Sequence, residues 1–341
     1  MTPIERGAIN STSAVPPEWA TWIFENIVRG TEDSAIVLAL THGGFGAAVA
    51  RDEIALVRDH PWTRAARPLS QPLRKLEALL AIRDTLTRLD ARTAAIERRG
   101  GVSRKEFLQN YYACNRPVIL QGLLDGNPAM ERWTPEYLNE ACGDLTVEIM
   151  SGRDDDPDYE IRSEMHRELM PFSAYIQRIT RGVPGNDVYL VANNSFFDKP
   201  GFEVLRDEVP PIPEYLRPRK AKGQIFFWFG PEGTVTPFHH DLMNILMAQI
   251  RGRKRITMVS PDQTPWMYNT VGVYSEVDCE NPDQVRHPLF RNVRRLTFDL
   301  HAGEILFIPV GWWHHIRALD TSMTITYTNF VFPNEFHWEN S

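Results

Sequence analysis

The sequence predicts a mainly β protein that also contains helices, in which a barrel or sandwich of short strands follows an N-terminal helical region. Two patterns support this fold class. From Val188 onward, short apolar runs alternate with turns that contain Gly and Pro, which is typical of sandwiches and barrels. In the first hundred residues, apolar side chains instead recur at threes and fours, which is the period of an amphipathic helix.

Residues 1–100 are expected to form an N-terminal helical region made of a small bundle and a long helix. Turn residues divide its first part into three short helices, over 19–28, 35–40 and 47–59. The long helix is predicted over 71–99, where leucines recur at threes and fours. We expect this helix to lie against its own domain, and a coiled-coil interface with a partner is the alternative.

After Gly101 the predicted elements alternate between helix and strand. Ser103 and Glu106 form a capping box that starts a helix over 103–114, and 116–120 and 145–150 are apolar enough for buried strands. The acidic run 154–158 lacks the glycine and the terminal glutamate of an EF-hand, so we expect a solvated loop there.

The remaining strands are predicted at 188–192, 224–229, 245–250, 255–259, 295–300, 304–309 and 324–332. The segment 264–294 between two of them holds little regular structure. Long loops at the mouth of a barrel often bind substrate, so Tyr268 and Tyr274 in this segment are candidate substrate contacts.

Composition and charge exclude several classes of protein. Of the 341 residues, 43% are hydrophobic and 24% are charged, which excludes a disordered chain and a collagen-like one. No apolar run is long enough to span a membrane, and the N-terminus lacks the apolar core of a signal peptide. The three cysteines form no CxxC pair, so we expect a cytoplasmic protein without a zinc knuckle. The net charge of −7 argues against a nucleic-acid partner.

Three side chains are the candidate catalytic residues and metal ligands. His239 and Asp241 are two residues apart, so on an extended segment both leave the same face. His314, from a later strand, could complete a triangle with them. Two imidazoles and one carboxylate on one side of an ion form the facial triad of non-haem Fe(II) oxygenases, in which the open positions receive a co-substrate and oxygen.

The motifs TPFHHD, AQIRGRKR, GEILFIPVGWWHHI and TITYTNF occur in this order between Thr236 and Phe330. Together they resemble the cupin-like branch of the JmjC superfamily, and the pattern is similar to that of the asparaginyl hydroxylase that inhibits hypoxia-inducible factor. The resemblance implies a double-stranded β-helix, the cupin or jelly-roll barrel, over 101–341. It also implies Fe(II) as cofactor, held by the triad, and 2-oxoglutarate as co-substrate.

The same resemblance assigns the co-substrate contacts. Lys254 matches the residue that pairs with the far carboxylate of 2-oxoglutarate, and Thr236 and Tyr189 match its hydrogen-bonding partners. Asn329 matches a polar residue near the iron-bound end. A dicarboxylate in a narrow barrel needs one buried cation and a few donors to offset its desolvation, which agrees with these residue types.

The sequence departs from the family pattern at one position. The family commonly has Asn four residues after the triad Asp, where this chain has Ile245, and Asn244 comes one residue earlier. On a strand Asn244 should therefore face away from the metal. His240 and His315 adjoin the proposed ligands and are expected to point to the opposite faces, with His240 as a substitute ligand if the strand register slips.

The resemblance implies a 2-oxoglutarate-dependent dioxygenase, here a hydroxylase of a protein or peptide side chain or of a small metabolite, which releases succinate and CO2. Three alternatives stay open: a non-catalytic metal-binding cupin that senses a ligand, an N-methyl demethylase, and a cupin enzyme that uses a metal without 2-oxoglutarate. The expected partners are the substrate and a second copy of the chain, bound through the N-terminal helices. We expect no membrane partner.

Overall fold

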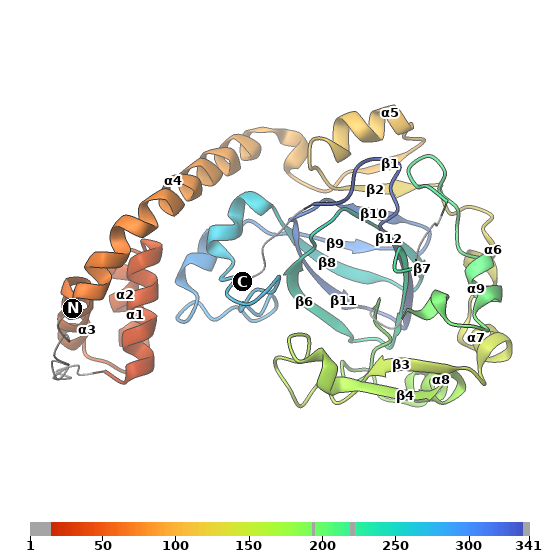
Figure 1. Ribbon diagram of the computed structural model, residues 1–341, viewed down its shortest axis with the longest axis horizontal. Coiled ribbons are helices and arrows are strands. Elements are labelled where there is room, and N and C mark those ends of the chain that lie inside the picture. Colours follow the sequence, from red (N-terminus) through yellow and green to blue (C-terminus); the bar gives the residue numbers. More distant parts are fainter. Residues whose placement is uncertain (1–14, 193–194, 219–221, 337–341) are drawn as a thin grey trace, which may run out of the picture.

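Two β-sheets face each other and enclose a barrel in the computed structural model, which describes residues 15–192, 195–218 and 222–336 (Figure 1). The larger sheet has the order β1-β2-β10-β7-β12-β5, with β1 (Arg98–Gly100), β2 (Val118–Gln121), β10 (Ile305–Ile308), β7 (Ile245–Arg251), β12 (Ser322–Tyr327) and β5 (Ile225–Gly230). The smaller sheet has the order β6-β11-β8-β9, with β6 (Val235–His240), β11 (Trp313–Ala318), β8 (Lys254–Val259) and β9 (Leu296–Leu300). The predicted fold class is confirmed.

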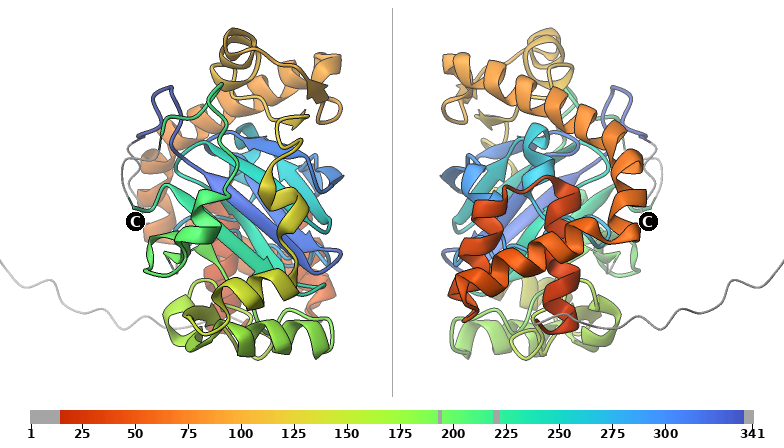
Figure 2. Two further views of the ribbon diagram at one scale, coloured as in Figure 1. Left: turned by 90° about the vertical axis from the view of Figure 1, so that its right-hand side faces the viewer. Right: turned by 90° about the vertical axis from the view of Figure 1, so that its left-hand side faces the viewer.

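Four helices precede the barrel, and three of them form the predicted small bundle at one side of the molecule (Figure 2). These three are α1 (Pro17–Arg29), α2 (Asp33–His42) and α3 (Ala47–Asp59). Their shared apolar core is built around Ile23, Ile36, Leu40 and Ile54. The long helix α4 (Pro61–Leu89) then runs from this bundle along the outer edge of the barrel (Figure 1).

The predicted limits of the long helix, 71 and 99, are both wrong. Pro61 is the first residue of α4, a position where proline is tolerated because its missing N–H would have no partner in the helix. The helix ends at Leu89 because the Asp90 side chain accepts a hydrogen bond from the backbone N–H of Arg92 and starts a short 3-10 turn, η1 (Ala91–Thr93). Residues 98–100 are strand β1, which pairs in parallel with β2.

Helices cover the outer face of the larger sheet at the side away from the bundle (Figure 1). They are α6 (Pro128–Arg132), α7 (Pro135–Cys142), α8 (Phe172–Arg181) and α9 (Glu203–Asp207), with the hairpin of β3 (Thr146–Met150) and β4 (Arg167–Pro171) beside them. The largest apolar core lies here and contains Trp133, Phe172, Phe227 and Phe229. The serine cap of the predicted capping box is confirmed, since Ser103 accepts from the N–H of Glu106 at the start of α5 (Arg104–Phe107), which continues into the π-turn η2 (Leu108–Tyr112).

The remaining short elements are the 3-10 turns η3 (Ser163–His166), η5 (Phe196–Asp198), η6 (Pro261–Trp266) and η7 (Pro288–Asn292). The predicted strand 188–192 appears only as isolated bridges, from Tyr189 to Met150 and from Leu190 to Phe229. In the described part of the chain, every helix is too short or too polar to cross a membrane.

A second apolar cluster fills part of the barrel interior. It includes Met247, Leu306, Ile308 and Ile316, which come from both sheets. This packing leaves a small pocket in the interior between the two sheets, and the polar residues predicted from the motifs gather there.

Candidate metal centre and co-substrate pocket

The predicted triad comes together at one end of the smaller sheet. His239 and His314 are directly paired residues of the neighbouring antiparallel strands β6 and β11, and their ring centroids are 4.1 Å apart. Asp241 follows the last residue of β6, and its Oδ2 is 3.3 Å from His314 Nε2. One ligand atom from each of the three residues lies within 4.8 Å of the others. The three side chains are therefore close enough to bind one ion.

Backbone contacts fix which nitrogen of each imidazole faces the centre. His239 Nδ1 lies 2.9 Å from the carbonyl oxygen of Pro237, and His314 Nδ1 lies 2.9 Å from that of Trp312. Each Nδ1 therefore carries the proton and donates it to the carbonyl, which leaves Nε2 as a lone-pair donor. This is the usual support for a metal-ligating histidine.

The protonation states also suit a metal. Burial, together with the neighbouring His314, lowers the pKa of His239 to about 4, so this imidazole is neutral near pH 7. Burial opposes the ionisation of Asp241, but the neighbouring histidines, His314 foremost, outweigh it and lower the pKa of the carboxyl. A neutral imidazole and an ionised carboxylate are the forms that bind divalent metals.

A bulge in β6 brings Thr236 into the same pocket. Between the pairs His239–His314 and Thr236–Ile316, three steps along β6 correspond to two along β11. The extra residue shifts the alternation of side chains, so Thr236 and His239 both face the interior although they are three residues apart. Strict alternation would have placed one of them outside the barrel.

The pocket has a volume of about 80 Å³ and holds Lys254 and Tyr189 beside Thr236 and the triad. Lys254 is 2% exposed, and its ammonium donates to the Tyr189 hydroxyl at 3.0 Å. Burial alone lowers its pKa to about 7. Among the described residues that line the pocket, the only carboxylate is Asp241, one of the triad. A buried amine without an acidic partner is stabilised by an anionic ligand, so the pocket fits a carboxylate-bearing co-substrate.

Arg153 packs against Tyr189, one of the residues that line the pocket, and the sequence did not predict it as part of the site. It is 1% exposed, and its guanidinium lies 5.3 Å from the ring centroid of Tyr189 and 4.2 Å from that of Tyr159. It also donates to Glu160 and to the backbone oxygen of Val235 at the start of β6. No pattern around residue 153 distinguishes it from a surface arginine in a polar loop, because its contacts with Tyr189 and Val235 come from distant segments.

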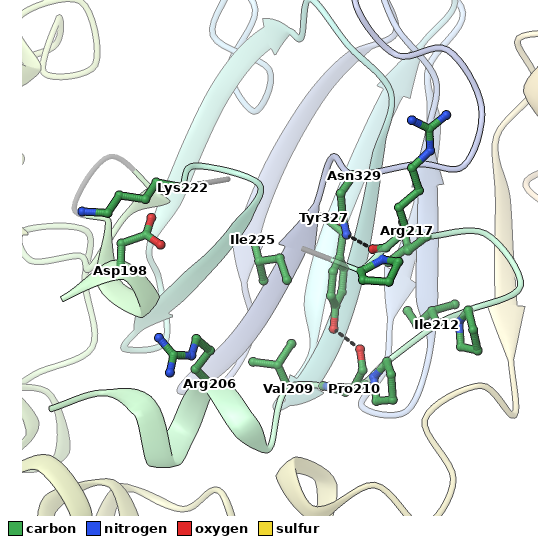
Figure 3. Close-up of a pocket in the computed structure, with 14 residues that line it drawn as sticks. Asp198, Arg206, Val209, Pro210, Ile212, Arg217, Lys222, Ile225, Tyr327 and Asn329 are labelled. Atoms are coloured by element: carbon green, nitrogen blue, oxygen red, sulfur yellow. Dashed lines mark hydrogen bonds between the residues drawn. The ribbon is translucent and has the colours of Figure 1, made fainter. Parts of the chain in front are cut away.

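Asn329 does not line this pocket, and its role in co-substrate binding stays a prediction. Strand β12 ends at Tyr327, and the chain then turns, so that the Asn329 amide donates to the backbone oxygen of Arg217 (Figure 3). Asn329 lines a separate cavity of about 700 Å³, whose walls include Val209, Pro210 and Tyr327.

The expectations for the neighbouring residues are confirmed. Ile245 lines the pocket, whereas Asn244 faces away and accepts from the N–H of Val310. His240 points to the outer side of β6 and packs against Trp313, with ring centroids 4.7 Å apart. His315 likewise lies outside the barrel interior, in the wall of a neighbouring groove.

This groove, of about 700 Å³, lies on the outer side of β6 and β11 and reaches the metal site at Tyr274. The Tyr274 ring lies 6.0 Å from that of His239. Burial raises the pKa of Tyr274, and Glu160 and Asp241 raise it further, so the phenol stays protonated near neutral pH. The acidic residues that line the groove are Asp154, Asp158, Glu160, Glu276, Asp278 and Glu280, and the basic ones are Arg286 and Arg317.

Comparison with known proteins identifies the family. Residues 103–336 match the model of the cupin-like domain. Curated relatives include the lysine-specific demethylase JMJ30 of Arabidopsis thaliana, 31% identical over 68% of this chain and 54% of the relative, and lysine-specific demethylase 8 of Xenopus tropicalis, 33% identical over 70% and 53%. The tRNA wybutosine-synthesizing protein 5 of Gallus gallus is 31% identical over 63% of this chain and 71% of the relative.

This chain spans about half the length of the two demethylases. The narrower likeness to an asparaginyl hydroxylase stays a prediction. The matched region contains the barrel, the His239–Asp241–His314 cluster and the buried Lys254. The chain therefore belongs to the JmjC-like cupin family, whose members use Fe(II) and 2-oxoglutarate.

Proposed function

We propose that this protein is an Fe(II)- and 2-oxoglutarate-dependent oxygenase that hydroxylates a C–H bond of its substrate. The observation that carries the proposal is the pairing, in one small pocket, of a facial triad with a buried lysine that forms no ion pair with any acidic residue in the described part of the chain. The triad alone would suit many metal proteins. Lys254 adds the feature that a metal site without a dicarboxylate would not need.

In the proposed reaction, His239, Asp241 and His314 would hold the Fe(II). Lys254 and the Tyr189 hydroxyl bind the far carboxylate of 2-oxoglutarate, with Thr236 as a further hydrogen-bonding group. When bound, the iron with 2-oxoglutarate and oxygen supplies the oxidising power for the substrate C–H bond, with release of succinate and CO2. The apolar walls formed by Met247, Ile308 and Ile316 exclude water from this reaction.

The charge of the groove supports a cationic substrate. Its six carboxylates outnumber its two arginines, and it meets the metal site at Tyr274. Such a surface attracts a lysine or arginine side chain of a protein and repels the phosphates of an RNA. We therefore infer that the substrate is a basic side chain, as in the relatives named as lysine demethylases, and not a tRNA, as in the relative named for wybutosine synthesis.

Demethylation is the second candidate, and the names of the two demethylase relatives favour it. The chemistry of the site is the same, because hydroxylation of an N-methyl carbon gives an unstable product that loses the methyl group. The two outcomes differ in the substrate carbon that faces the metal.

The test is turnover of 2-oxoglutarate with basic peptides, offered both unmodified and N-methylated on lysine. The proposal expects succinate formation coupled to a peptide that gains one oxygen atom. Loss of a methyl group would assign demethylation instead. A protein that binds Fe(II) and 2-oxoglutarate but never forms succinate above the level of a His314→Ala control would favour the non-catalytic sensor.

A further inference from the structure

Helix α4 contacts its own chain through polar residues. Thr63, Ser70 and Asp84 are its most buried side chains, each no more than 6% exposed. They are separated by multiples of seven residues and so share one face of the helix. Thr63 donates to the backbone oxygen of Val57, and Arg88, which also pairs with Asp84 inside the helix, donates to the backbone oxygen of Asn292, so this seam is polar in its contacts as well. The favoured prediction, a helix that lies against its own domain, is confirmed, but the contacting face is not the one that carries most of the leucines.

The leucines of α4 point outward instead. Besides Trp62 in the first turn, seven large apolar side chains of this helix are between 56% and 78% exposed: Leu69, Leu73, Leu76, Leu79, Ile82, Leu86 and Leu89. We call this set the leucine stripe. The helix lies along the outer edge of the molecule, with the bundle and the barrel on its other side (Figures 1 and 2). The exposed apolar area of the leucine stripe is on the order of 800 Å², which is what one partner contributes to a standard interface. The apolar patches typical of monomers are smaller, at ~300–600 Å².

The rest of this chain offers little to cover the stripe. The described residues pack on the opposite, polar side of the helix. The terminal residues outside the described part, 1–14 and 337–341, contain only four large apolar side chains, which are Met1, Ile4, Ile9 and Trp338. Seven exposed leucine and isoleucine side chains therefore need a partner that brings an apolar face of its own.

We propose that the partner is a second copy of this chain, bound through antiparallel packing of the two α4 helices around a twofold axis at Leu79. The spacing of the apolar residues in the leucine stripe is nearly symmetric about Leu79. Leu76 and Ile82 are three residues from it on either side, and Leu69 and Leu89 are ten residues from it. A twofold interface requires such self-complementarity, since residue i of one copy meets residue j of the other and the reverse. Antiparallel packing also places the N-terminus of each helix beside the C-terminus of the other, which suits their dipoles.

The charge of α4 distinguishes a second copy of the chain from an anionic membrane or a nucleic acid as the partner. The exposed charged side chains described on α4 are all basic, namely Arg64, Lys75, Arg83 and Arg88. Two copies therefore repel each other weakly, and apolar burial is the attraction. Added salt should leave the dimer intact or strengthen it, because salt screens the repulsion. Binding of the same basic face to an anionic membrane or to nucleic acid would weaken with salt.

The experiment measures the molar mass of the full chain by sedimentation equilibrium at low and high salt, for the wild type and Leu79→Glu. The proposal expects a wild-type dimer and a dissociation constant that Leu79→Glu raises by on the order of 100-fold, because two carboxylates would meet at the axis. The thermal unfolding of the variant should be unchanged apart from the loss of dimer. Leu169→Glu, at another apolar residue that is 66% exposed, is the matched control and should stay dimeric.

A mixture of variants tests the axis itself. Leu79→Lys should be monomeric alone, and equimolar Leu79→Lys and Leu79→Glu should form a dimer, because residue 79 faces its own copy. A wild-type monomer at high concentration, a dimer that survives Leu79→Glu, or a mixture that stays monomeric would each overturn the proposal. So would a wild-type monomer that binds anionic vesicles through this face. None of these results depends on the catalytic activity.

Discussion

At the scale of single residues, Lys254 connects the fold to the proposed chemistry. Strand β8 places its amine inside the barrel, where Tyr189 is its hydrogen-bond partner and no pocket-lining acid other than Asp241 of the triad is described. An ammonium in that position costs folding free energy in the ligand-free protein. The same buried charge attracts a carboxylate when one binds. Removing the charge of Lys254 should therefore raise the stability of the ligand-free protein and lower its affinity for 2-oxoglutarate.

Lys254→Met tests this opposition. The variant should raise the KM for 2-oxoglutarate by on the order of 100-fold, because the carboxylate loses its buried partner. It should also raise the free energy of unfolding of the ligand-free protein by about 1–3 kcal/mol, as seen when buried charges are replaced by apolar groups. Steady-state kinetics and urea unfolding measure the two effects. Lower stability together with an unchanged KM would contradict the role of Lys254.

The pH dependence follows from the same residue. The pKa of Lys254 is lowered to about 7 in the folded, ligand-free protein, from 10.5 in the unfolded chain. Between these values the unfolded chain binds more protons, so the stability of the wild type should rise with pH relative to Lys254→Met. Binding of the carboxylate needs the charged amine, so the KM for 2-oxoglutarate should rise by up to about tenfold per pH unit above pH 7. Lys254→Arg, which stays charged, should show a flat profile.

The motifs predicted that the triad and Lys254 lie together, and the structure places them in one pocket, whereas Tyr189 lies outside these motifs and was assigned by the resemblance alone. The placement of two other residues could not be derived from strand alternation. Thr236 reaches the pocket only through the bulge in β6, which strand alternation does not predict. Asn329 was expected in the pocket, but β12 ends at Tyr327, and the end of a strand is set by tertiary contacts that the local sequence does not show.

At the scale of elements, the long helix ends, and a strand begins, earlier in the chain than the sequence suggested. Residues 98–100 continue the pattern of a polar helix, yet they pair with β2 and extend the larger sheet. The contact that holds them is non-local: Arg98 donates to Glu304 at 2.9 Å, and Glu304 is 7% exposed. Helical propensity does not predict this strand pairing, because the hydrogen bond to a buried acceptor more than 200 residues away outweighs the local preference for a helix.

Glu304→Ala tests whether β1 is an integral part of the barrel. Glu304 also accepts from Gln121 and from the N–H of His301, so its removal breaks three hydrogen bonds to a buried carboxylate, including the one that holds β1. We expect a loss of about 2–4 kcal/mol in the free energy of unfolding, measured with urea. Asp320→Ala, which breaks the exposed pair with Arg253, should cost less than about 1 kcal/mol. Equal costs for the two variants would show that β1 adds nothing to the barrel.

At the scale of the whole molecule, charge is distributed unevenly. The chain carries a net charge of −7, the groove beside the metal site is acidic, and the exposed charges described on α4 are basic. Composition predicted the acidic balance but not its location, because the groove is assembled from the loop around 154–161, the segment 270–286 and two strands.

Reversing charge in the groove tests the proposed substrate class. Asp154→Lys with Asp158→Lys should raise the KM for a basic peptide by about tenfold, because the variant loses attraction and adds repulsion. The KM for 2-oxoglutarate should not change, since the pocket around Lys254 is untouched. Asp207→Lys with Asp125→Lys carries the same change of net charge outside the groove and is the control. An equal effect of both double variants would remove the groove from substrate binding.

Anaerobic titration tests the proposed oxygenase site most directly. Fe(II) followed by 2-oxoglutarate should produce a metal-to-ligand charge-transfer band in the wild type at one iron per chain. His314→Ala should show no band, and Lys254→Met should show it only at much higher 2-oxoglutarate concentration. A well-folded wild type that binds Fe(II) without this band at saturating 2-oxoglutarate would contradict the assignment.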